Sequence, residues 1–323
     1  MIRISEIIKM GGGNTPEKEK HITIKESSIE DIPKLIDYTE AKKNVAHELY
    51  GRGLLMMEET IAKIKKDEVP DPKPILNFVK ELVENILVEE NEQFNCFYRA
   101  TPPIVYLQGH CVNVSLLSGK MGMWSGLNKS ELMDLTAAGL LHDIGMVRVE
   151  DITLKDGALD RGERSRVNKH AEYSVSILRT MKALTDKVLV AVRSHHNRGP
   201  RDRLSQIIGL ADIYEAMTHP RVYRKAYLPH QAIAEIVDKH SDSFQPEIIK
   251  TLVNNIGIYP IGSMVRLSNG EAAMVIGVSK EYPLRPKVSI LFNRSGERLG
   301  QAQVLDLTTE PHLYIDGPFD ASA

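Results

Sequence analysis

Cysteine is scarce in this chain of 323 residues, which contains only Cys96 and Cys111. The two are too far apart for a C-x-x-C motif, which excludes a zinc ribbon or a disulfide scaffold and favours a reducing cytoplasm. Long apolar runs are also missing, since runs such as Val188–Val192 fall far short of the roughly 20 residues that a membrane span requires. The N-terminal segment MIRISEIIKMGGGN lacks the apolar region of a secretory signal. These absences predict a cytoplasmic protein that does not enter a membrane.

An excess of positive charge is absent as well. Lys and Arg total 41 against 43 Asp and Glu, which gives a formal net charge of −2. Non-specific binding of nucleic-acid polymers depends on a strong basic field, so this class of protein is excluded. The composition is otherwise ordinary, with 42% hydrophobic and 26% charged residues, which is enough apolar material for a core. A length of this order suggests about two domains.

Apolar residues recur at helical spacing through most of the chain. Residues 41–64 predict one long amphipathic helix or two in succession, and residues 75–87 predict another after a break made by prolines. From residue 104 to about residue 254 the period stays near 3.6. The pattern then changes to period 2. Asn269-Gly270 separates two apolar runs, which is a strong β-hairpin signal, and residues 287–292 and 303–307 add two strand-like runs.

We therefore predict a mainly α protein with three parts. Residues 1–100 form an N-terminal helical region, residues 101–257 an all-helical bundle, and residues 258–323 a small β appendage. The N-terminal region contains no signal-receiver or cofactor motif. We interpret it as a regulatory or dimerising region, which leaves a homodimer and signalling protein partners as open alternatives.

Histidines and aspartates gather in the predicted bundle. A carboxylate on a buried helical face is costly unless it is paired or binds a metal, and neutral imidazoles that converge with it remove that cost. Each histidine taken alone is more simply a core residue, but their recurrence in one helical domain favours a metal site. The remaining histidines, among them His219, we interpret as structural or surface residues. The candidate ligands are His110, His142, Asp143, His170, His195, His196 and Asp212.

The chemistry of this set restricts the metal. Mixed nitrogen and oxygen ligands suit divalent Fe, Mn, Co, Ni or Zn, and suit Ca²⁺ or Mg²⁺ poorly. Five histidines and two aspartates exceed what one ion needs, so a binuclear site with a bridging carboxylate is the simplest interpretation. We expect His142-Asp143 to end a helix, with Gly145 as its C-cap.

The order and spacing of these residues resemble the HD-GYP family. That family is a branch of the HD phosphohydrolase superfamily, and its studied members hydrolyse the bacterial second messenger cyclic di-GMP. The similarity covers roughly residues 40–310. The matching segments are HDIG at 142–145, LKDGAL at 154–159, Glu163, His170, His195-His196, Ala211-Asp212 and RVYR at 221–224.

The resemblance implies roles for the candidate ligands. One metal ion would be held by His110, His142, Asp143 and Asp212. Asp143 would also bridge to a second ion, held by His170, His195 and His196. The expected cofactors are two divalent ions, Fe or Mn, with a water or hydroxide between them that attacks the phosphorus at a catalytic centre around Asp143.

Basic residues complete the site that the resemblance implies. Arg221 and Arg224 fall where family members place basic groups near the substrate phosphates, and helix-terminus salt bridges are an equal alternative for both. Arg198 and Arg201 are further candidate phosphate contacts.

The sequence departs from the family pattern at three places. The loop after the paired histidines is contracted to residues 197–201, where Gly199-Pro200 remains but the tyrosine of the Gly-Tyr-Pro motif is missing. Met146 stands where a lysine commonly follows HDIG. Tyr106 stands where members with three metals carry a glutamate, which predicts two metals. The first two departures remove groups that contact substrate.

Three functions are therefore open. The first is a metal-dependent phosphodiesterase that acts on cyclic di-GMP or a related nucleotide. The second is a degenerate member that binds a nucleotide or a protein partner without turnover. The third keeps hydrolysis but acts on another substrate, because a contracted loop leaves a more open cleft. The missing tyrosine and lysine predict slow turnover with anion binding retained.

Overall fold

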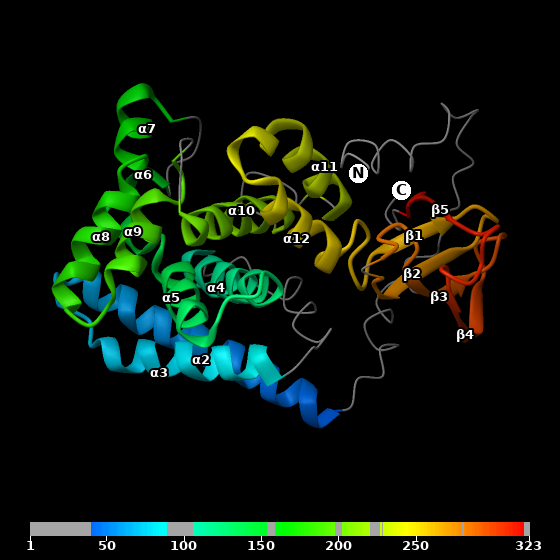
Figure 1. Ribbon diagram of the computed structural model, residues 1–323, viewed down its shortest axis with the longest axis horizontal. Coiled ribbons are helices and arrows are strands. Elements are labelled where there is room, and N and C mark those ends of the chain that lie inside the picture. The colour runs from blue at the N-terminus through cyan, green and yellow to red at the C-terminus, as the bar shows by residue number, and fades with distance from the viewer. Residues whose placement is uncertain are drawn as a thin grey trace. The chain divides into compact units, whose positions relative to one another are not determined.

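The computed structural model describes residues 40–88, 106–153, 159–197, 202–219, 227, 229–279 and 281–319, and for residues 40–47, 86–88 and 153 the backbone alone. Within these ranges the chain divides into two compact units. The helical unit contains residues 44–226 and 242–248, and the second unit contains residues 227–241 and 249–323. The prediction of a mainly α fold with a C-terminal β appendage is confirmed (Figure 1). Cys96 and all four candidate arginines, Arg198, Arg201, Arg221 and Arg224, lie outside the described residues.

The helical unit opens with two long helices, α2 (Glu40–Lys65) and α3 (Pro72–Val88). Residues 41–64 thus form one continuous helix, and the second helix begins at Pro72, where a proline ring is tolerated. The two helices run beside each other (Figure 1). The Arg52 guanidinium of α2 donates to the Glu81 carboxylate of α3. Their apolar faces are buried, with Met57 and Val79 fully inaccessible to solvent.

The centre of the unit is built from helices that are buried around most of their circumference, polar residues included, rather than along a single apolar stripe. In α4 (Tyr106–Trp124) every residue from 109 to 122 is buried. It packs against α5 (Lys129–Leu141) and α10 (Arg203–Thr218). Asn128 begins α5 with a capping box in which it exchanges hydrogen bonds with Glu131.

Shorter helices close the unit around this centre. After α5 the chain forms a 3-10 helix, η5 (Ile144–Val149), then α6 (Glu150–Thr153) and α7 (Arg161–Val167). Then α8 (His170–Met181) packs against η5, and α9 (Asp186–Ser194) packs against α5 and α8. The chain continues through α11 (Pro229–Lys239), which belongs to the second unit, the 3-10 turn η6 (Ser241–Ser243), and α12 (Pro246–Ile256), most of which also belongs to the second unit.

The β appendage is one antiparallel sheet of five strands in the order β4-β3-β2-β1-β5. The predicted hairpin is confirmed: Gly270, with φ of +87°, turns β1 into β2. The predicted strand at 287–292 is also confirmed, whereas the strand predicted to begin at residue 303 begins at residue 298. The strands are β1 (Met264–Leu267), β2 (Ala272–Gly277), β3 (Lys287–Phe292), β4 (Arg298–Asp306) and β5 (Ile315–Pro318).

The described part of the chain contains no helix that is both long and apolar enough to cross a membrane.

Candidate metal centre

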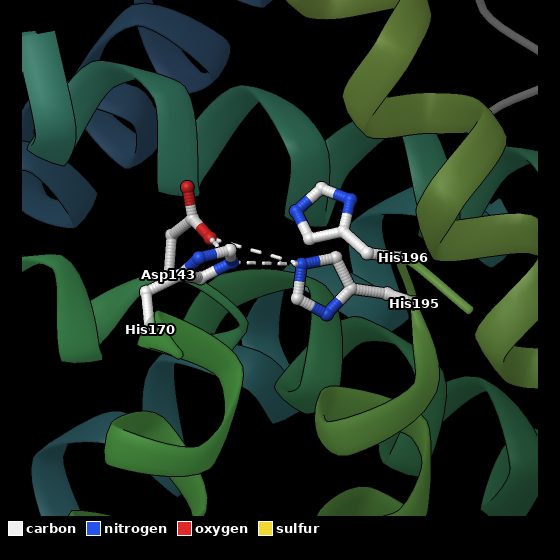
Figure 2. A group of neighbouring side chains, drawn as sticks. All are labelled: Asp143, His170, His195 and His196. Atoms are coloured by element: carbon white, nitrogen blue, oxygen red, sulfur yellow. Dashed lines mark hydrogen bonds and ion pairs between the residues drawn. The ribbon is translucent and has the colours of Figure 1, made fainter. Parts of the chain in front are cut away.

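The seven predicted ligands come from different parts of the helical unit and meet in one place. His110 lies in the second turn of α4, and His142 and Asp143 follow directly on α5. His170 is the first residue of α8, His195 and His196 follow α9, and Asp212 lies within α10. Figure 2 shows the His170 and His195 rings close to the Asp143 carboxylate, with His196 beside His195. Ligand atoms within 4.8 Å of one another form three overlapping groups: Asp143, His170, His195 and His196; His110, His142 and Asp143; and His142, His195 and Asp212.

Asp143 belongs to two of these three groups. Its Oδ1 is 3.2 Å from His170 Nε2, 3.5 Å from His142 Nε2 and 3.8 Å from His195 Nε2. Its Oδ2 is 3.5 Å from His110 Nε2. One carboxylate therefore faces imidazoles of both ligand sets that the sequence predicts.

Asp212 is the second carboxylate of the centre. Its Oδ1 lies 3.2 Å from His110 Nε2 and 4.0 Å from His142 Nε2. Its Oδ2 lies 3.8 Å from Nδ1 of His196, a residue whose side chain is half exposed. Asp212 therefore extends the group around His110 towards the solvent-facing histidine.

The backbone fixes which nitrogen of three imidazoles carries the proton. His142 Nδ1 donates to Gly139 O at 2.9 Å, His170 Nδ1 to Val167 O at 2.7 Å and His195 Nδ1 to Val192 O at 2.6 Å. A carbonyl oxygen only accepts, so each Nδ1 bears hydrogen, and in the neutral ring each Nε2 presents a lone pair. All three Nε2 atoms face Asp143.

The described residues fit a divalent cation. Asp143 Oδ1 is buried and has no hydrogen-bond partner among them, although three imidazole nitrogens surround it. Lone pairs that face a carboxylate repel it unless a proton or a metal cation lies between them. Burial lowers the pKa of His142 and of His195, which keeps both rings in the neutral form that binds metals. Burial alone would raise the pKa of Asp143, but His142, His110 and His170 hold it well below its usual range.

His110 differs from the other three ligands because its Nδ1 contacts a side chain. Glu215 Oε2 accepts from His110 Nδ1 at 2.5 Å, and Glu215 is only 1% exposed. Burial would raise the pKa of Glu215, but the charge and hydrogen bond of His110 lower it to about 2. Glu215 is not among the residues predicted from the sequence. The signal for it in the sequence is a second carboxylate one turn after Asp212, in a helix whose residues are mostly buried.

A glycine next to the ligands has a different role from the one predicted. Gly145 does not cap α5: it lies in η5, and its φ is not positive. A Cβ atom on Gly145 would lie 2.2 Å from His170 O and 2.4 Å from Ser174 N. Its N–H donates to Ser174 Oγ, which in turn donates to His142 O. Glycine at this position therefore allows η5 to approach the first turn of α8 closely, which places His170 beside Asp143.

Two positions that depart from the family pattern lie beside the centre. Tyr106 begins α4, is 38% exposed, and stacks on the His110 ring with centroids 5.5 Å apart and planes 14° apart. A phenol ring thus lies one turn before the first ligand, at the position where a third metal would need a carboxylate. Met146 lies in η5, three residues after Asp143.

Two known families match parts of the chain. The family model of the HD domain matches residues 107–217, a range that contains every predicted ligand. The family model described as a KOW domain associated with HD domain matches residues 264–323, which contain all five strands.

Curated proteins similar to this chain are phosphodiesterases. A cyclic di-GMP phosphodiesterase of Pseudomonas aeruginosa is 27% identical over 62% of this chain and 52% of its own length. A cyclic di-GMP phosphodiesterase of Borreliella burgdorferi is 24% identical over 56% of this chain and 51% of its own length. A 3′3′-cGAMP-specific phosphodiesterase of Vibrio cholerae is 28% identical over 45% of this chain and 31% of its own length. The chain spans about half the length, or less, of these relatives.

A solved structure shares the fold. An HDG"Y"P protein from Bdellovibrio bacteriovorus superimposes with a TM-score of 0.54 at 16% sequence identity, over 69% of this chain and 76% of that chain.

Proposed function

Because the chain belongs to the HD-GYP family of HD-domain proteins, we propose that it is a metal-dependent phosphodiesterase that hydrolyses cyclic di-GMP or a related cyclic dinucleotide. The observation that carries the proposal is the carboxylate of Asp143, whose Oδ1 is buried and whose oxygens face the Nε2 atoms of His110, His142, His170 and His195 within 3.8 Å. Such a carboxylate is suited to bridging two cations.

The proposed cofactors are two divalent ions, Fe or Mn. His110, His142, Asp143 and Asp212 would hold one, and Asp143, His170, His195 and His196 the other. Two bound ions lower the pKa of a water molecule and neutralise charge on the attacked phosphate. Tyr106 supports two ions over three, because its aromatic ring lies against His110.

The chain's own residues orient this chemistry. The backbone bonds of His142, His170 and His195 keep their Nε2 atoms directed at the centre. Arg198, Arg201, Arg221 and Arg224 are proposed, from the family resemblance, to bind the substrate phosphates, because a guanidinium pairs with phosphate through two hydrogen bonds. We also predict that residues 1–100 form a regulatory or dimerising region. This region would bind signalling proteins or a second copy of the chain.

Binding without turnover is the second candidate. Met146 favours it, since the described structure has an uncharged side chain in η5 where relatives place a lysine. Loss of one group that stabilises developing charge slows chemistry by about 10²–10³-fold. The two candidate functions therefore differ in the rate of hydrolysis, and both require that the protein binds an anionic ligand.

An assay with metal-loaded protein tests the proposal. Protein reconstituted with Fe²⁺ or Mn²⁺ is incubated with cyclic di-GMP or 3′3′-cGAMP, and products are separated by chromatography. We expect slow hydrolysis, and an affinity for the dinucleotide that falls about 10-fold or more in Arg221→Ala. Arg179→Ala, on the exposed face of α8, is the matched control and should bind as the wild type does.

Each outcome of this assay decides something. Binding with no hydrolysis favours the second candidate. If the protein neither binds nor hydrolyses any dinucleotide, the proposed function is wrong. If Arg221→Ala binds the dinucleotide as tightly as the wild type does, Arg221 does not bind the substrate phosphates.

Metal binding should strengthen as the pH rises. In the metal-free protein, burial lowers the pKa of His110 and of His170, but Glu215, Asp143 and Asp212 raise the first well above 6.5, and Asp143 raises the second. Protons on these rings stabilise the fold below pH 6.5, and this contribution is lost as the pH rises through the raised pKa values. A bound cation replaces those protons, so its affinity rises over the same range.

Thermal unfolding measures this effect. We expect the difference in Tm between protein with Mn²⁺ and protein with EDTA to be larger at about pH 8 than at about pH 6. A difference that shrinks with rising pH would contradict the exchange of protons for metal.

A further inference from the structure

A buried chain of hydrogen bonds leads from the N-terminal helix α2 to the ligand His110. Tyr50 in α2 donates its hydroxyl to Asn113 Oδ1 in α4 at 3.0 Å. Asn113 Nδ2 donates to Glu215 Oε1 in α10 at 2.9 Å, and Glu215 Oε2 accepts from His110 Nδ1 at 2.5 Å. None of the four side chains is more than 9% exposed. Three helices thus contribute to the orientation of one imidazole.

The carboxylate fixes the direction of every bond in this chain. An ionised Glu215 only accepts, so Asn113 must direct its amide nitrogen at Glu215 and its carbonyl oxygen at Tyr50. His219 lies behind the carboxylate, with Nδ1 3.4 Å from Glu215 Oε1, and is 4% exposed. With Glu215 as acceptor, His110 Nδ1 carries hydrogen and His110 Nε2 faces Asp143 and Asp212.

This arrangement makes His110 different from its neighbours. His142, His170 and His195 are each oriented by the carbonyl three residues earlier in their own segment. The Nδ1 of His110 is instead held by a side chain 105 residues away. Its orientation therefore depends on how α2, α4 and α10 pack together.

We propose that Tyr50, Asn113 and Glu215 are positioning residues for His110, through which α2 sets the affinity of the His110 half of the metal centre. The proposal rests on the proposed function, because it assumes that the centre binds two ions. A partner of a ligand imidazole commonly contributes 10–100-fold to metal affinity. Tyr50 acts through two further side chains, and the loss of one hydrogen bond corresponds to about 2- to 10-fold.

Equilibrium binding of Mn²⁺ to the full chain tests the proposal. Two bound ions should give two classes of Mn²⁺ site with separate dissociation constants. The class that is weakened in His110→Ala is the one to which His110 contributes. We expect Glu215→Gln to weaken that class by about 10–100-fold and Tyr50→Phe by about 2- to 10-fold, with the other class unchanged. Thr60→Val is the matched control, since it removes another buried hydroxyl of α2, whose bond goes only to Met56 O in the same helix.

A double variant separates positioning from general stability. If the residues act in series, Tyr50→Phe should add almost nothing in a Glu215→Gln background. Thermal unfolding of each metal-free variant shows whether it folds, and Glu215→Asp, which keeps the acceptor, replaces Glu215→Gln if that variant does not.

The results distinguish this inference from the function on which it rests. A wild type that binds no Mn²⁺ overturns both. A wild type that binds two ions and hydrolyses the dinucleotide, beside a Tyr50→Phe variant with unchanged affinity, overturns the positioning role alone. Equal weakening of both classes, or fully additive losses in the double variant, also overturns it.

Discussion

Asp143→Ala should lose both metal ions and reduce phosphodiesterase activity by about 10³-fold or more, because the ions contribute several kcal/mol to the reaction. The carboxylate faces four imidazoles, and its Oδ1 is buried without a hydrogen-bond partner among the described residues. Without this negative charge two divalent cations in one site would repel each other. Elemental analysis of protein produced with added iron or manganese measures the loss.

Two variants show whether the loss is specific to the bridging position. His110→Ala should lower the affinity for one ion and leave the other ion bound. Asp151→Ala, which removes an exposed carboxylate of α6 paired with Arg166, should leave metal content unchanged. Full metal content in Asp143→Ala would show that Asp143 does not bridge.

Gly145→Ala should destabilise the helical unit by about 3 kcal/mol or more. It should also lower the affinity for the ion that we propose His170 binds. The added Cβ atom would lie 2.2 Å from His170 O, a backbone atom that cannot rotate away as a side chain does. Either η5 or the first turn of α8 must move, and both carry ligands or flank them. Chemical denaturation measures the free energy of unfolding, and metal analysis of the folded protein measures the second effect.

Gly51→Ala makes the same substitution without a collision. Gly51 lies inside α2, and a Cβ atom there has no neighbour within 4 Å. This variant should stabilise the protein by about 0.5–1 kcal/mol, because alanine favours a helix over glycine. Equal stability of Gly145→Ala and the wild type would mean that the close approach of η5 to α8 is not required.

Local patterns predict much of this fold. The apolar period identifies α2 and α3, and Asn269-Gly270 identifies the first hairpin, because helix periodicity and turn chemistry are properties of neighbouring residues. The short strand β5 contains Gly317 and Pro318, which disfavour strands. It forms because it pairs with β1, about 50 residues earlier in the chain, and local sequence does not record that pairing.

In the candidate site, too, some features follow from local sequence and others depend on contacts between distant segments. The seven candidate ligands stand out in the sequence because histidines and aspartates are unusual on buried helical faces, and the fold brings them together. Glu215 is also a carboxylate in a mostly buried helix, but its partner His110 lies 105 residues away. In sequence Gly145 resembles a helix C-cap, because glycine often ends helices. The backbone of α8 that it contacts is known only from the fold.

The hydrogen bonds from three candidate ligand histidines to backbone carbonyls have a consequence for the exchange of bound ions. Because each of His142, His170 and His195 is oriented by its own segment, these rings need no ion to hold their direction. Coordination then requires little new order, unlike a zinc finger, which folds only around its metal. Ions should exchange without unfolding of the chain, so the metal found in purified protein would record which cations the cell supplied during synthesis.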